Sequence, residues 1–89
     1  MIERKDLLSL NFYESRPFTG SDGKMRYRVE KLLEETTDGA SPRLQATVWP
    51  GPYAFAKTAD EKKTRHTAPF SEDGLQELTE WMNQQQPNF

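Results

Sequence analysis

The chain has 89 residues, which is enough for one small domain with a thin core. Twelve basic and fourteen acidic residues give a net charge of −2. This balance argues against bulk electrostatic binding to nucleic acid or to an anionic membrane, but it leaves room for a local basic patch. Because the chain has no cysteine, disulfides, thiolate metal sites and a cysteine nucleophile are excluded.

The first six residues, MIERKD, are mostly charged, and we expect them to be a frayed lead-in. The prediction is a single domain over residues 1–89, with its ordered core over about 7–85. The chain shows no apolar segment typical of a signal peptide, and no apolar run approaches the length of a membrane span. The predicted location is therefore the cytoplasm, with no membrane partner.

Three segments alternate apolar and polar residues with a period of two, which is typical of half-buried β-strands. They are residues 7–13 (LLSLNFY), 24–33 (KMRYRVEKLL) and 44–49 (LQATVW). One predicted face carries Leu8, Leu10, Phe12, Met25, Tyr27, Val29, Leu44, Ala46 and Val48. The other predicted face carries Ser9, Asn11, Tyr13, Arg26, Arg28, Glu30, Gln45, Thr47 and Trp49. Short links between the segments predict an antiparallel meander in the order 1-2-3.

Two stretches with turn chemistry separate these strands, at residues 14–23 and 34–43. In the first, Asp22-Gly23 is a good site for a positive φ. In the second, Asp38-Gly39 is the predicted tip of the turn. The sequence therefore predicts a compact meander with loops at both ends.

The connection after the third strand begins at Pro50, which ends the ladder because proline has no backbone donor. Thr58 and Glu61 have the spacing of a capping box, which predicts a short helix over residues 59–64. Residues 65–70 are predicted to be extended.

The last element is a helix that we expect to begin at the N-cap Ser71. Leu75, Leu78 and Met82 form a stripe that should pack on the sheet, and Pro87 closes the helix. The predicted fold class is α+β. It is a three-stranded antiparallel β-meander packed on one face by a C-terminal α-helix, with a short helix in the connection (βββ-α-α).

The residues offer little for catalysis. His66 is the one histidine and lies in a polar linker. Three carboxylate doublets are better explained by turn solvation and helix capping than as acid–base pairs; they are Glu34-Glu35, Asp60-Glu61 and Glu72-Asp73. There is no glycine-rich phosphate loop, no metal-ligand spacing and no Ser-His-Asp order. We therefore expect no enzyme, no cofactor, no metal and no small-molecule substrate.

The outward face of the predicted sheet is the candidate binding surface. Arg26 and Arg28 lie on the central strand, with Tyr13 and Trp49 on the flanks. Such a surface suits a protein interface, where Arg, Tyr and Trp are enriched as anchors. It also suits bases and phosphates, and a polar outer face with no ligand stays an alternative. The predicted function is a small interaction module that binds a protein partner or a second copy of itself; the alternative is a nucleic-acid-binding domain that uses the same face.

A second candidate is the basic run Lys57, Lys62, Lys63, Arg65 and His66. It suits an acidic partner or a phosphate backbone. Acidic residues within the run and along the last helix favour internal neutralisation instead.

The motifs MRYRVEK, ATVWPGPYAFAKT and KKTRHTAPFSEDGLQELTEWMNQQ resemble a set of small uncharacterised bacterial proteins with an MRYR strand, a Trp-Pro corner and a C-terminal W-[LM]-N helix. This resemblance covers residues 7–85 and implies a bacterial cytosolic protein, without assigning site residues. Gly23-Lys24 and Arg26-Tyr27-Arg28 are also similar to the three-stranded-sheet DNA-binding domains of AP2-type factors and of the arm-binding ends of phage-type integrases. Those domains insert the sheet into the major groove, and they are basic, whereas this chain has a pI near 5.4.

Overall fold

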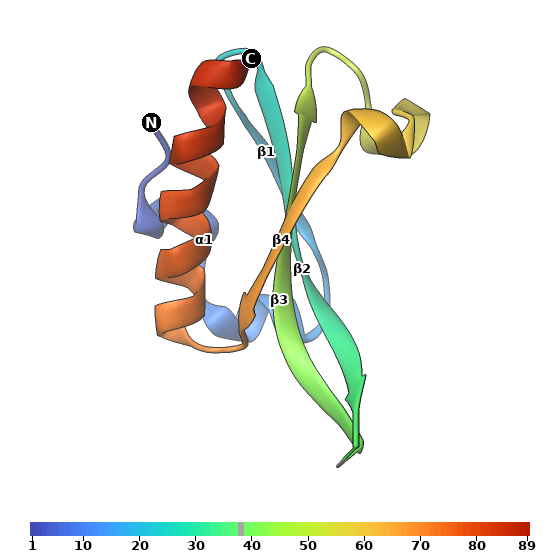
Figure 1. Ribbon diagram of the computed structural model, residues 1–89. Helices are drawn as coiled ribbons and strands as arrows, with labels where there is room; N and C mark the ends of the chain where they lie inside the picture. The colour runs from blue at the N-terminus through green and yellow to red at the C-terminus, as the bar shows by residue number, and fades with distance from the viewer. Residues whose placement is uncertain (38) are drawn as a thin grey trace.

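The computed structural model describes residues 1–37 and 39–89 and has two layers, an antiparallel sheet and an α-helix on one of its faces (Figure 1). The sheet has the order β1-β2-β3-β4, with β1 at Phe18–Asp22, β2 at Met25–Thr36, β3 at Gly39–Pro50 and β4 at Thr64–Pro69. The helix α1 spans Glu72–Gln85. Short 3-10 helices lie at Arg4–Leu7, Leu10–Glu14, Phe55–Lys57, Asp60–Lys62 and Gln86–Asn88. The α+β class, with an antiparallel sheet against a C-terminal helix, is confirmed, but the sheet has four strands rather than three.

β2 and β3 carry the alternation that the sequence predicts. They pair without a break from Met25↔Pro50 to Thr36↔Gly39. One face of this pair is the core that α1 covers, and its buried members are Met25, Tyr27, Val29, Leu44, Ala46 and Val48. The predicted turn at residues 34–43 is wrong in extent, because the strands continue almost to the tip. Asp38, half of the predicted tip, lies outside the described residues.

Residues 7–13, predicted as the first strand, instead contain the end of one 3-10 helix, a link at residues 8–9 and most of a second 3-10 helix. Residues three apart lie on one side of a 3-10 helix. In the second helix, Leu10 and Tyr13 accordingly face the core, Leu10 partly and Tyr13 fully buried. Leu7 at the end of the first helix is also buried, whereas Leu8 in the link is 40% exposed. The Tyr13 hydroxyl donates to the Leu7 carbonyl oxygen and holds the two helices together.

The first strand lies inside the stretch predicted as a turn. β1 pairs with β2 from Phe18↔Val29 to Asp22↔Met25 across the two-residue loop 23–24. Gly23 has φ +62, so the predicted positive φ is confirmed. The sequence of β1, FTGSD, has one large apolar residue, Phe18, which packs against the core, and shows no apolar–polar alternation beyond it. A short strand of this kind is common at the edge of a sheet.

The segment predicted to be extended after the connection is β4, the fourth strand. It pairs with β3 from Arg43↔Pro69 to Val48↔Thr64. Pro69 fits there because an edge strand can end in a residue without a backbone donor.

The predictions for α1 are confirmed. The Ser71 side chain accepts a hydrogen bond from the Gly74 amide at 3.0 Å, as an N-cap does. Leu75, Leu78 and Met82 are fully buried against the sheet, and each contributes about 1.5–3 kcal/mol by leaving water. No helix in the described ranges is long and apolar enough to cross a membrane.

The frayed lead-in is a wrong prediction. Ile2 is 4% exposed and belongs to the core. Its amide donates to Asn83 Oδ1, and Asn83 Nδ2 donates to the Ile2 carbonyl oxygen, both at 2.8 Å. These two bonds fix the first residues against α1.

The entry of α1 requires glycine at position 74. A Cβ atom there would lie 1.8 Å from the carbonyl oxygen of Pro69 at the end of β4. We expect Gly74→Ala to lower the free energy of unfolding by about 3 kcal/mol, the upper end of typical overpacking costs, as measured by urea denaturation. The matched control is Gln76→Ala on the exposed side of the same helix, expected within about 0.5 kcal/mol of the unsubstituted chain. Equal stability of the two variants would contradict the close approach.

Candidate functional site

The outer face of the sheet, opposite α1, is the candidate site. Arg28 of β2 faces Thr47 of β3, and Thr47 faces Arg65 of β4. The face carries Thr19, Ser21, Arg26, Arg28, Glu30, Gln45, Thr47, Trp49, Arg65 and Thr67. The predicted separation of β2 and β3 into an apolar and an arginine-bearing side is therefore confirmed.

Residues 51–63, the covering loop, fold over one end of this face, on the side of the sheet away from α1 (Figure 1). The indole N–H of Trp49 donates to the Tyr53 carbonyl oxygen at 2.8 Å. The Phe55 ring lies 5.3 Å from the indole at 70°, edge to face. Trp49 is consequently fully buried, although it points away from the core, and Thr47 on the same face is fully buried as well.

Two cations hold Phe55 over the sheet. The Arg28 guanidinium lies 4.4 Å from the ring centroid and the Lys63 ammonium 4.0 Å from it. Arg28 also forms an ion pair with Glu30 at 2.9 Å. Because of these contacts, a substitution at Arg28 changes the covering loop as well as the surface, so Arg28 is a poor probe of binding alone.

The predicted helix over residues 59–64 is a single 3-10 turn at Asp60–Lys62, and the capping box is wrong. The Thr58 hydroxyl donates backwards to the Ala54 carbonyl oxygen at 2.7 Å. Thr58 therefore closes the preceding turn and does not cap the next one.

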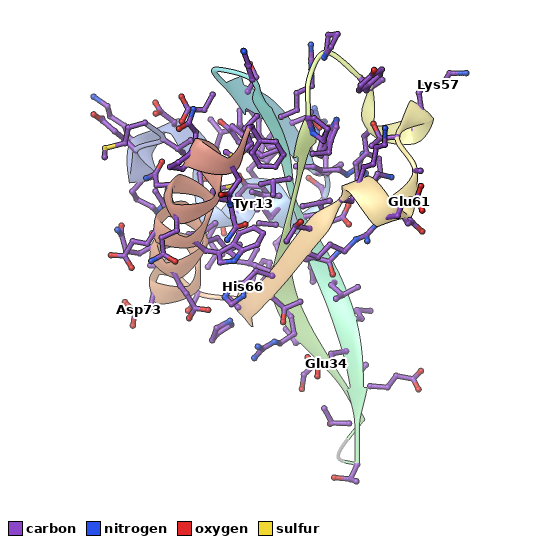
Figure 2. The ribbon with its side chains drawn as sticks, turned by 45° about the horizontal axis from the view of Figure 1, so that its top comes forward. Tyr13, Glu34, Lys57, Glu61, His66 and Asp73 are labelled. Carbon is purple, nitrogen blue, oxygen red and sulfur yellow. The ribbon has the colours of Figure 1, made fainter. Side chains whose placement is uncertain are left out.

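The structure brings only part of the predicted four-residue surface together. Arg26 and Arg28 share the outer face, and Trp49 shares it but is covered. Tyr13 lies on the other side of the sheet, where it belongs to the core and is 1% exposed (Figure 2). Burial raises the pKa of Tyr13 to about 12. The open arginine–aromatic surface formed by these four residues is thus not present.

The sequence-based choice of residues missed a hollow in the covering loop. Its volume is about 210 Å³, and its lining is Tyr53, Lys57, Thr58, Ala59 and Lys62. The Tyr53 ring is on the surface at 52% exposure, with Lys62 Nζ 5.9 Å from its centroid. The basic run in the sequence was the signal that pointed to this region.

Charge separates between the two sides of the molecule. The outer face, the β1–β2 loop and the covering loop carry Lys24, Arg26, Arg28, Arg43, Lys57, Lys62, Lys63 and Arg65 against Glu30, Glu34, Asp60 and Glu61. α1 carries Glu72, Asp73, Glu77 and Glu80 and neither lysine nor arginine. Figure 2 shows Lys57 projecting from the loop and Asp73 from α1, on opposite sides of the sheet. The net charge of the chain is therefore close to zero although the outer side of the sheet is basic.

Part of the basic run is neutralised, as the sequence suggested, but within the loop. Asp60 accepts from Arg65 at 3.2 Å and lies 3.7 Å from Lys63. The hydrogen bond from Arg65 and the charges of Arg65 and Lys63 lower the pKa of Asp60. Only His66 reaches α1, with its Nε2 2.7 Å from Glu77 Oε2. In residues 1–37 and 39–89, Lys57 and Lys62 have no carboxylate partner, and no cluster of His, Asp and Glu could hold a metal ion.

The covering loop is expected to depend on Phe55. In a Trp81→Phe background, which leaves Trp49 as the only indole, Phe55→Ala should red-shift the emission and increase quenching by acrylamide, because the ring that covers the indole is gone. The expected loss of stability is about 1.5–3 kcal/mol. Tyr53→Ala is the matched control, since Tyr53 accepts from the Trp49 indole through its backbone carbonyl, which the substitution keeps. Similar quenching of both variants would contradict the proposed cover.

The buried phenol of Tyr13 should make stability fall at high pH. Its pKa is about 12 when folded and near 10 when unfolded, so its stabilising contribution is complete below pH 10 and lost as the pH rises towards 12. Across that window, the free energy of unfolding of Tyr13→Phe should fall by up to about 2–3 kcal/mol less than that of the unsubstituted chain. Chemical denaturation at pH 9 to 12 measures how the stability of each chain depends on pH, and parallel curves would refute the raised pKa of Tyr13.

At neutral pH, Tyr13→Phe should itself be less stable than the unsubstituted chain by about 1–3 kcal/mol, since the Leu7 carbonyl loses its hydrogen-bond partner.

Comparison with known proteins gives no family to set beside this geometry. No protein-family model, no curated protein and no solved structure matches the chain. The resemblances drawn from its motifs stay predictions.

Proposed function

We propose that the chain is a small binding module that holds single-stranded nucleic acid on its outer face and covering loop. The observation that carries the proposal is the segregation of charge: cations gather around the outer face while α1 is acidic. A polyanion would approach from the basic side and be repelled by the other. Arg26 and Arg28, the two arginines predicted from the sequence, belong to this surface.

The covered state of Trp49 and Tyr13 favours nucleic acid over the protein partner that the sequence analysis placed first. A protein hot spot needs large aromatic anchors that a partner can reach, and both rings are at most 1% exposed. The accessible side chains are mainly long cations. Arginine suits both kinds of partner, but the exposed Lys57 and Lys62 of the covering loop are of a residue type that is depleted in protein interfaces. The outer face together with its loop therefore suits phosphate groups better than a protein core.

The covering loop also favours a single strand over a duplex. A sheet that enters a major groove must present a clear face, and residues 51–63 stand over one end of this one. α1 cannot take the place of a groove-reading helix, because its exposed side is acidic. Single-strand binders combine a basic track with exposed rings on which bases stack. Tyr53, Lys57 and Lys62 supply both in one hollow.

A second candidate, association with a protein or with another copy of the chain, is favoured by the β2–β3 hairpin. β2 continues beyond Val29, its last residue paired with β1. β3 extends beyond Arg43, which pairs with Pro69, the last residue of β4. The outer part of the hairpin has open strand edges and a 62% exposed Leu33, and exposed edges are templates for strand pairing.

The nucleic-acid proposal predicts salt-dependent binding of an oligodeoxythymidine. The chain should bind it at low salt and lose affinity steeply as salt rises. Replacing both Lys57 and Lys62 by Gln should reduce affinity and lower the slope of log K against log salt by about one to two. Fluorescence anisotropy with labelled single-stranded and duplex oligonucleotides measures both quantities.

Lys5→Gln is the matched control, since Lys5 is an exposed cation outside the outer face and its loop. It should leave affinity and slope unchanged. No binding at low salt, or an equal effect of Lys5→Gln, would refute the proposal. Light scattering of the ligand-free chain tests the second candidate, which requires a mass above that of the monomer for self-association.

A further inference from the structure

A second hollow lies at the end of the outer face, where the β1–β2 loop meets the corner after β3. The Gly51 amide donates to the Lys24 carbonyl oxygen at 2.8 Å and holds the two turns together. The hollow has a volume of about 390 Å³ and is lined by Ser21, Gly23, Lys24, Arg26, Gly51 and Pro52. It opens on the same side of the sheet as the covering loop, because Ser21 and Arg26 face each other on the outer face.

Arg26 differs from the other arginines of the chain. Four of them lie within 3.3 Å of a carboxylate oxygen; they are Arg4, Arg28, Arg43 and Arg65. Arg16 lies over the Phe12 ring. In the described ranges Arg26 has neither a carboxylate nor a ring partner, although its side chain is half-buried. A partly desolvated guanidinium without a counter-ion is stabilised when an anion binds.

Arg26 lies beside the corner after β3. A Cβ atom on Gly51 would be 3.4 Å from Arg26 Nε and 3.5 Å from its Cγ, so the arginine side chain runs next to the glycine. Within the described ranges the guanidinium forms no ion pair, so its hydrogen-bond donors are available to a ligand.

The lining has the donors that a phosphate group needs and no carboxylate to repel it. A guanidinium can bind two phosphate oxygens at once, Lys24 adds a second positive charge, and the Ser21 hydroxyl adds a neutral donor. The volume lies within the range of small-ligand sites, so it leaves room for more than a bare phosphate.

We propose that this hollow binds the terminal phosphate of a nucleic-acid strand through Arg26, Lys24 and Ser21. The inference rests on the proposed function, because a strand lying on the outer face would have one end near this hollow. A terminal phosphate is preferred to an internal one because it carries up to two negative charges and three free oxygens for the same donors. Single-stranded binding would then depend on how the strand ends.

Three oligodeoxythymidines of equal length test the inference, one with a 5′-phosphate, one with a 3′-phosphate and one with hydroxyl groups at both ends. One phosphorylated strand should bind about tenfold more tightly than the hydroxyl-ended strand. Arg26→Gln should bring the ratio of these two affinities close to one. Arg26→Lys, which keeps the charge but loses the planar fork, should leave an intermediate ratio. Lys5→Gln should not change it.

A titration with inorganic phosphate, followed by amide NMR, separates the hollow from the strand. The amides of Ser21, Gly23, Lys24 and Gly51 should shift in the unsubstituted chain and not in Arg26→Gln. Equal affinity for all three strands overturns the inference and leaves the proposed function intact. If no strand binds but these four amides respond to phosphate, the hollow stands as a phosphate site and the proposed function falls. If phosphate shifts none of these four amide signals, or shifts the amides near all surface lysines to the same extent, the inference is overturned.

Discussion

The register between β2 and β3 is the constraint on which the rest of the molecule depends. It places Tyr27 and Val29 opposite Val48 and Ala46 under α1, and it places Arg28 on the far side. A slip of one residue would exchange the two faces of a strand. Arginine would then be buried against the helix without partners, and apolar side chains would face water. The core and the basic side are therefore two results of one pairing, and neither can change without the other.

The parts of this fold that could be predicted from the sequence are those in which local pattern and burial agree. KMRYRVEKLL alternates from Lys24 to Glu30, and the apolar positions Met25, Tyr27 and Val29 are buried. Ser71 marks the start of α1 because its hydroxyl group satisfies an otherwise unpaired helical amide. Arg26 and Arg28 were placed on the outer face by the same parity. For these residues, the local sequence pattern was enough to predict the structure.

The remaining parts depend on contacts that a single segment does not encode. LLSLNFY fits a period of two as well as a spacing of three, and the hydrogen bond from Tyr13 to Leu7 favours the second. FTGSD is a strand only because β2 is beside it. Trp49 was correctly oriented, yet its accessibility depends on Phe55, six residues later in a loop without a periodic pattern. The candidate site changed for that reason: the loop removed one aromatic ring from the surface and brought Tyr53 and two lysines to it.

The paired hydrogen bonds between Ile2 and Asn83 have a practical consequence for handling the protein. They keep the first residues beside α1, and both ends of the chain in Figure 1 lie on the helix layer. Both ends also lie close to the β1–β2 turn, since the Met1 ammonium is 3.1 Å from Asp22 Oδ1 and Gln86 approaches Gly23. A sensor surface attached at either terminus would therefore leave the covering loop turned towards the solution, but it would stand next to the turn that lines the second hollow.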